Sequence, residues 1–111
     1  MQGIPTVSVD QLPTPLPEGI TVLDVREPVE WQHGHVDGSV HVPMMEIPDR
    51  VGELPADGQV LVVCKVGGRS ARVVQYLVAQ GVDAVNLDGG LLEWEAAGKP
   101  LVSDAGAPMV V

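Results

Sequence analysis

Two short segments, residues 20–25 and 59–63, are hydrophobic almost without interruption. A strand with one solvated face alternates apolar and polar residues, whereas a strand covered on both faces shows a nearly continuous apolar run. Both segments are short and rich in valine, which favours strands over buried helices. They therefore predict central strands of a sheet that is covered on both faces.

The remaining segments alternate between short apolar runs and helical patterns. Residues 70–80 place four apolar side chains on one helical stripe and are followed by Gly81, which is typical of a helix and its C-terminal stop. The other candidates are strands at residues 7–9, 39–42 and 84–87 and short helices at residues 45–51 and 91–97. This order predicts the α/β class, with a central, mainly parallel β-sheet flanked by helices on both faces.

A chain of 111 residues suits a single domain. We expect an N-terminal segment over residues 1–6, the domain over residues 7–102 and a mobile C-terminal tail over residues 103–111, because the tail carries no periodic hydrophobic signal. The chain begins without the basic and long apolar regions of a secretory signal, so we expect it in the cytoplasm.

The charges are strongly unbalanced and unevenly placed. Six Lys and Arg against fifteen Asp and Glu give a formal net charge of −9, which disfavours nucleic acid and anionic membranes as partners. Residues 58–82 nevertheless contain no acidic residue, although Lys65, Arg69 and Arg72 lie there. This window is where a small anion is expected to bind.

Cys64 is the single cysteine of the chain, which excludes an intramolecular disulfide and any site built from several cysteines. It follows the most clearly predicted strand, residues 59–63, and precedes the most clearly predicted helix, residues 70–80. Ligands of parallel sheets gather at the carboxyl ends of strands. A lone cysteine is often only a small buried hydrophobe. Its surroundings favour a nucleophile instead, because a purely structural cysteine requires neither the neighbouring glycines nor the local positive charge.

The loop from Cys64 to Ser70 combines parts that suit an anion. Gly67 and Gly68 permit a tightly curled backbone, whose N–H groups then point inward as a nest. The N-terminus of the following helix adds unpaired N–H groups and partial positive charge. In this setting, the thiol pKa of Cys64 is expected below its usual value.

Three motifs resemble the rhodanese-like family, specifically its single-domain thiosulfate sulfurtransferases. The loop from Cys64 to Ser70 resembles the family's Cys-x-x-Gly-x-Arg-Ser active-site loop, and residues 23–39 resemble its upstream signature. Residues 86–100 resemble its closing segment, so the resemblance covers nearly the whole chain. It implies that Cys64 takes sulfur from a small anionic donor such as thiosulfate, forms a persulfide and passes the sulfur to a thiol, a protein or, in the assay, cyanide. The residues expected to hold the substrate are Lys65, Val66, Gly67, Gly68, Arg69 and Ser70.

The upstream signature supplies two further candidates, Asp24 and Arg26. We expect Asp24 to orient groups of the loop. Arg26 either serves the site, by reaching the substrate anion or supporting the loop, or forms an ion pair with Asp24, Glu27 or Glu30.

Histidines in the upstream signature raise the question of a metal. His33 and His35 lie two residues apart, as metal ligands on an extended segment can. The other ligands of such a site are missing from the sequence, so we expect neither a metal nor a cofactor.

Two alternatives to sulfur transfer remain open. One is a rhodanese module without catalysis that binds a partner or senses sulfur. The other is a phosphatase or arsenate reductase, whose cysteine loops resemble Cys-x5-Arg. Only four residues separate Cys64 from Arg69, which disfavours the second alternative because a shorter loop forms a narrower anion pocket.

Overall fold

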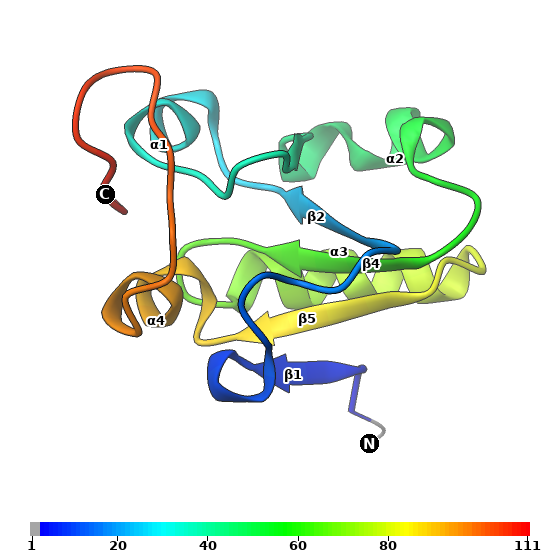
Figure 1. Cartoon of the computed structure of the whole chain (residues 1–111). Coiled ribbons are helices and arrows are strands. Elements are labelled where there is room, and N and C mark those ends of the chain that lie inside the picture. The colour runs from blue at the N-terminus through cyan, green and yellow to red at the C-terminus, as the bar shows by residue number, and fades with distance from the viewer. Residues whose placement is uncertain (1–2) are drawn as a thin grey trace.

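The computed structural model describes residues 3–111 and contains one five-stranded sheet. Its strands are β1 (Thr6–Ser8), β2 (Ile20–Asp24), β3 (Val40–His41), β4 (Gln59–Val63) and β5 (Ala84–Asp88), in the order β1-β5-β4-β2-β3. All neighbouring pairs are parallel, so the carboxyl ends of the strands lie at one edge, on the left of Figure 1. The predicted parallel sheet is confirmed.

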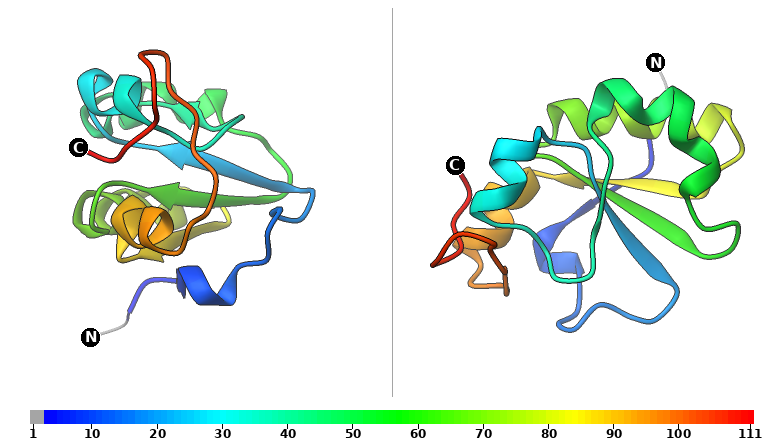
Figure 2. Two further views of the ribbon diagram at one scale, coloured as in Figure 1. Left: turned by 60° about the vertical axis from the view of Figure 1, so that its left-hand side comes forward. Right: turned by 90° about the horizontal axis from the view of Figure 1, so that it is seen from above.

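The α-helices are α1 (Pro28–His33), α2 (Ile47–Arg50), α3 (Gly68–Ala79) and α4 (Gly90–Ala96). Three short 3₁₀ turns complete the fold, η1 (Val9–Gln11), η2 (Met44–Glu46) and η3 (Val51–Glu53). Figure 2 shows α2 and α3 on one side of the sheet and α4 on the other. Within the described residues, no helix is long and apolar enough to cross a membrane.

Strand β4 shows why both faces of the sheet must be covered. Val60 and Val62 join the core cluster beneath α2 and α3, whereas Leu61 and Val63 join the cluster beneath α4. All four side chains are at most 1% exposed. Full burial of such a side chain contributes roughly 1.5–3 kcal/mol, so this strand anchors both layers of the core.

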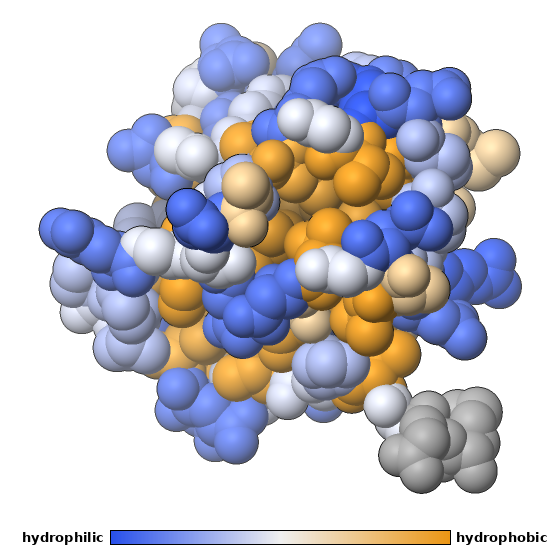
Figure 3. All heavy atoms as spheres, turned by 90° about the vertical axis from the view of Figure 1, so that its right-hand side faces the viewer, coloured by the Kyte–Doolittle hydropathy of each residue, from blue (hydrophilic) through white to orange (hydrophobic). Residues whose placement is uncertain are grey.

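The amino ends of the strands form the opposite end of the molecule. Figure 3 views this end, where apolar side chains gather between polar ones. Ile20 and Val82 are only partly buried there, at or just before the start of a strand. This apolar surface therefore lies at the far end of the sheet from the loop that follows β4.

Helix α1 was not among the predicted elements. It has six residues, begins with Pro28 at its first turn and contains no fully buried residue, so it carries no apolar stripe. Helix α3 also begins at Gly68, two residues before the predicted start. Both differences place helical backbone next to the candidate site.

Residues 103–111, for which a mobile tail was predicted, make contacts with the domain. The Met109 N–H donates to His33 O at 2.9 Å, and the Val110 N–H donates to Glu95 Oε2 at 2.9 Å. Val110 is 7% exposed and belongs to the core cluster of α4. One apolar side chain and its backbone hydrogen bonds thus dock a segment that has no periodic pattern. Of the expected N-terminal segment 1–6, residues 1–2 lie outside the described range, and Thr6 already belongs to β1.

Candidate active site

Cys64 lies where β4 ends at the carboxyl edge of the sheet, and its loop turns directly into α3. Gly67 precedes the helix with a φ of 101°, a left-handed conformation that favours glycine. A Cβ atom there would also lie 3.3 Å from the Gly89 nitrogen. The curled loop predicted from the glycines is therefore present at the N-terminus of α3.

The Cys64 sulfur is held by donors of its own loop. The Gly67 N–H donates to Sγ at 3.1 Å and the Ser70 N–H at 3.4 Å, while the Ser70 hydroxyl lies 3.3 Å away. Burial raises the thiol pKa, but the Ser70 hydroxyl and the N–H groups of Ser70, Gly67 and Val66 outweigh it, so that the pKa of Cys64 falls below its usual value. These donors favour a thiolate and equally suit a bound sulfur anion.

A second turn, between β5 and α4, supports the loop by hydrogen bonds to its backbone carbonyl groups. The Leu91 N–H donates to Cys64 O at 2.9 Å, and the Leu92 N–H donates to Lys65 O at 3.0 Å. Gly90 has a φ of 63°, and a Cβ atom there would lie 2.6 Å from Cys64 O. The backbone of this turn can approach the loop only because Gly90 has no side chain.

Asn86 adds a further support from β5. Its Nδ2 donates to Gly67 O at 3.3 Å, and its Oδ1 is buried without a hydrogen-bond partner. Sequence reasoning gave no role to Asn86 or Gly90. The pair of glycines after β5 was the only local signal of a close backbone approach.

Arg69 is bound to an acidic residue that was not predicted as part of the site. Its Nη1 lies 2.8 Å from Glu30 Oε1 and its Nη2 lies 2.9 Å from Glu30 Oε2, a bidentate ion pair between α3 and α1. The hydrogen bonds from Arg69 outweigh burial and lower the pKa of Glu30 from 4.5 to about 2. Glu30 lies 39 positions from Arg69 in the chain, so no local spacing could have indicated the contact.

Asp24 and Arg26 form a second ion pair, which is fully buried. Arg26 Nε lies 2.9 and 3.1 Å from the two Asp24 carboxylate oxygens, and Arg26 Nη2 lies 2.7 Å from Asp24 Oδ2. Nη2 also donates to Gly34 O at 2.7 Å, which ties β2 to the end of α1. Both side chains are 0% exposed. Of the two roles considered for Arg26, the structure shows the ion pair with Asp24.

The histidines of the upstream signature make contacts with the backbone. His33 Nδ1 lies 2.8 Å from Val29 O, and His35 Nδ1 lies 2.7 Å from Trp31 O. Trp31 stacks on His35 with ring centroids 3.6 Å apart and on His41 at 4.8 Å. These rings therefore pack around α1, which carries Glu30.

The rest of the loop faces outward. Lys65 is partly exposed, Gly68 is exposed and Val66 is 60% exposed. Val66 and Gly89 line a cavity of about 610 Å³ that extends over η1 and α4 and is bordered by charged side chains. These are Asp10, Asp88, Glu93 and Lys99. Of the loop from Cys64 to Ser70, Val66 alone lines this cavity, and Cys64 does not.

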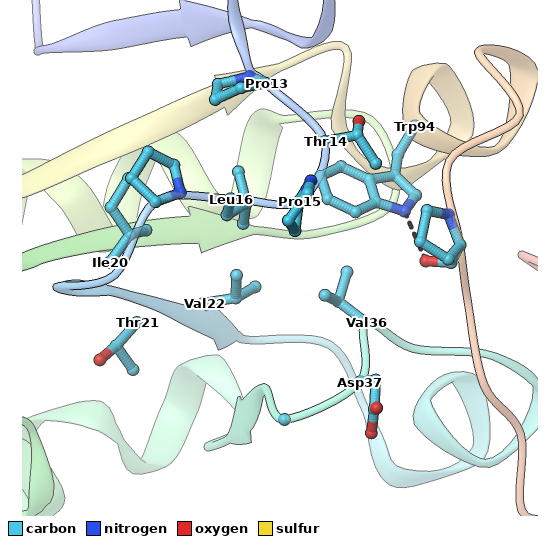
Figure 4. A pocket seen from close by; sticks show the side chains of 13 residues that line it. Pro13, Thr14, Pro15, Leu16, Ile20, Thr21, Val22, Val36, Asp37 and Trp94 are labelled. Carbon is cyan, nitrogen blue, oxygen red and sulfur yellow. Dashed lines mark hydrogen bonds between the residues drawn. The ribbon is translucent and has the colours of Figure 1, made fainter.

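A separate cavity of about 350 Å³ lies over β2, beneath the proline-rich segment 13–17 (Figure 4). Its wall includes Trp94, whose Nε1 donates to Pro100 O at 2.9 Å. No residue of the loop from Cys64 to Ser70 lines it. It is therefore not the cavity of the candidate site.

Comparisons with known proteins find relatives over most of the chain. The family model of the rhodanese-like domain, which describes the sequences of that family, matches residues 8–97 of this chain. A sulfurtransferase of Allochromatium vinosum is 37% identical over 90 residues, which cover 80% of this chain and 84% of that protein. The thiosulfate sulfurtransferase GlpE of Pseudomonas putida is 36% identical over 80 residues, covering 71% and 73% of the two chains.

A solved structure is also similar to this chain. The rhodanese-related protein of Thermoplasma volcanium superimposes with a TM-score of 0.74 at 36% identity, covering 77% of this chain and 85% of the other. The matched region includes most of the described fold. This chain therefore belongs to the family of rhodanese-like domains.

Proposed function

We propose that this protein is a sulfurtransferase that moves sulfane sulfur through a persulfide on Cys64. The donor is thiosulfate or a similar small anion, and the acceptor is a thiol, a protein or, in vitro, cyanide. The observation that carries the proposal is the set of N–H and O–H donors around Cys64 Sγ. Relatives named as sulfurtransferases support sulfur transfer as the type of reaction.

The first step forms the persulfide. The Cys64 thiolate attacks the outer sulfur of thiosulfate, the S–S bond of the donor breaks and its electron pair leaves with sulfite. Because the Ser70 and Gly67 N–H groups point at the Cys64 sulfur, they are placed to hold the anionic persulfide without a metal. Lys65 adds a positive charge near the loop, whereas Arg69 is paired with Glu30.

The second step regenerates the enzyme. A nucleophilic acceptor attacks the outer sulfur of the persulfide, and the Cys64 thiolate leaves. The two half-reactions share one covalent intermediate, so the steady-state kinetics are expected to be ping-pong.

Loop length separates this proposal from phosphatase chemistry. With four residues between Cys64 and Arg69, the ring of N–H groups has room for one sulfur atom, whereas a phosphoryl group brings three peripheral oxygens. The loop also contains no Asp or Glu that could protonate a leaving group. The wild type should therefore not hydrolyse aryl phosphates.

The deciding experiment is intact-mass measurement after treatment with thiosulfate. We expect a gain of one sulfur atom, released as thiocyanate on addition of cyanide. Cys64 is the only cysteine, so Cys64→Ser should lose both the gain and the thiosulfate:cyanide activity while keeping its thermal unfolding transition. A wild type that never gains sulfur would favour a module without catalysis, and a Cys64→Ser variant that keeps activity would refute the role of Cys64.

A further inference from the structure

The pairing of Arg69 places a negative charge beside a loop that has none of its own. Residues 58–82 contain no Asp or Glu, yet α1 brings the Glu30 carboxylate to within 2.8 Å of the Arg69 guanidinium. The Glu30 side chain is 16% exposed and that of Arg69 is 33% exposed. Both charges thus lie at a partly desolvated edge of the site.

Glu30 is held firmly in this position. Its Oε1 also accepts the Glu27 N–H at 2.9 Å, a contact within the first turn of α1. Its pKa of about 2 keeps it a carboxylate near neutral pH. The pKa of Arg69 is raised, chiefly by the hydrogen bonds to Glu30. Arg69 directly precedes Ser70, whose N–H donates to the Cys64 sulfur at 3.4 Å, so the ion pair belongs to the same turn of backbone that holds the sulfur.

A donor anion that approaches Cys64 therefore does not encounter an unpaired arginine. It meets an ion pair with almost no net charge, together with the N–H groups that surround the Cys64 sulfur. A dianion suffers repulsion from Glu30 and has to compete with it for Arg69. A donor with a single negative charge loses less binding affinity to this repulsion, because the N–H groups of Gly67 and Ser70 suffice to hold one anionic sulfur.

We propose that Glu30 is a specificity-determining residue, which pairs with Arg69 and shifts the preference of the site from dianionic towards monoanionic sulfane-sulfur donors. Thiosulfate belongs to the first class, and thiosulfonates and the hydropersulfides of small thiols belong to the second. The inference rests on the proposed sulfur transfer and concerns the donor step of that reaction.

Two donors of similar size make the test sharp. Thiosulfate carries two negative charges, and methanethiosulfonate carries one because a methyl group replaces a charged oxygen. With methanethiosulfonate, the Cys64 thiolate attacks the outer sulfur, the S–S bond breaks and methanesulfinate leaves with the electron pair. The number of atoms and the total charge are the same on both sides, as they are with thiosulfate.

Glu30→Gln removes the charge but keeps an oxygen for the Glu27 N–H. We expect the variant to lower KM for thiosulfate about fivefold at low salt, since a partly exposed ion pair is worth about 1 kcal/mol. The kcat should change less than twofold, and so should KM for methanethiosulfonate. The thiosulfate effect should shrink as ionic strength rises, which a loss of mere structural support would not do.

Glu27→Gln is the matched control. It removes the same charge from the same turn of α1, and its exposed side chain takes no part in the two hydrogen bonds of the bidentate pair, while its backbone N–H to Glu30 is kept. Its KM values for both donors should stay near those of the wild type. Equal changes for the two donors in Glu30→Gln, or a higher KM for thiosulfate, would show that Glu30 only positions Arg69 and would overturn the inference.

A binding measurement keeps this test separate from turnover. Sulfate and methanesulfonate, a dianion and a monoanion, are compared as protectants of Cys64 against iodoacetamide in the wild type, Glu30→Gln and Glu30→Ala. We expect both variants to improve protection by sulfate selectively, and unchanged protection would overturn the inference. If the wild type gains no sulfur from either donor, the proposed function fails, whereas the protection series still reports the charge preference of the site.

Discussion

The ion pair between Asp24 and Arg26 allows a structural role to be separated from substrate binding. Asp24→Asn leaves the Arg26 guanidinium buried without a counter-charge, and Arg26→Met leaves the Asp24 carboxylate in the same condition. Both side chains are 0% exposed, and the three hydrogen-bond distances between them range from 2.7 to 3.1 Å. Each single change should lower the free energy of unfolding by about 3–5 kcal/mol.

Removing both charges together should be less damaging than removing one. Asp24→Leu combined with Arg26→Met leaves no buried charge, although Gly34 O then loses the donor that lies 2.7 Å away. We expect the double variant to be more stable than either single variant, because most of each single loss is the cost of an unpaired buried charge. The coupling between the two positions should thus exceed that of any exposed pair in the chain.

Urea unfolding followed by circular dichroism measures these differences, provided that the slope with denaturant stays constant. Donor kinetics measured well below the unfolding transition supply the second readout. If Arg26 is structural, the folded Arg26→Met variant should keep a KM for thiosulfate within twofold of the wild type. A variant with wild-type stability and a much higher KM would refute this reasoning and show that Arg26 reaches the donor.

Three further predictions concern the loop and its supports. Ser70→Ala removes a hydrogen bond to Cys64 Sγ and should raise the thiol pKa, so the pH profile of iodoacetamide alkylation should shift to higher pH. Gly90→Ala forces a methyl group against Cys64 O at a positive φ and should lower both the unfolding temperature and the sulfur-transfer rate. The Glu30–Arg69 pair should stabilise the fold fully above pH 4.5 and lose this effect as pH falls towards 2, so the stability gap between wild type and Glu30→Gln should close over that range. The lowered pKa of Glu30 corresponds to at most about 3 kcal/mol of the free energy of unfolding. Because Arg69 is 33% exposed, screening by solvent reduces this contribution to about 1 kcal/mol.

The sheet could be predicted from the sequence because its strands are covered on both faces. Segments such as β4 have no polar residue between Val60 and Val63, and only a doubly covered strand accommodates that pattern. Helix α3 could be predicted because it is long enough to show an apolar stripe. Helix α1 could not, since six residues with partly or fully exposed side chains give no periodic signal.

The partners of the loop were harder to predict than the loop itself. Glycines, a cysteine and a helix start are close together in the sequence, so their geometry follows from local rules. Glu30 and Asn86 reach the loop from other elements, at separations of 39 and 19 residues from their partners. Such contacts depend on how α1 and β5 pack, and local patterns in a single sequence do not predict that packing.

The two arginines of the signature motifs are both paired with carboxylates in this chain of net charge −9. Arg26 is neutralised by Asp24 inside the fold, and Arg69 is neutralised by Glu30 at the edge of the site. The atoms that point directly at the Cys64 sulfur are instead the N–H groups of Gly67 and Ser70 and the Ser70 hydroxyl. Because backbone N–H groups carry only partial charge, we expect them to stabilise a single anionic sulfur better than a dianion. We therefore expect the charge of the donor, rather than its size alone, to decide how well it competes for Cys64, with Glu30 as the residue that we propose sets this preference.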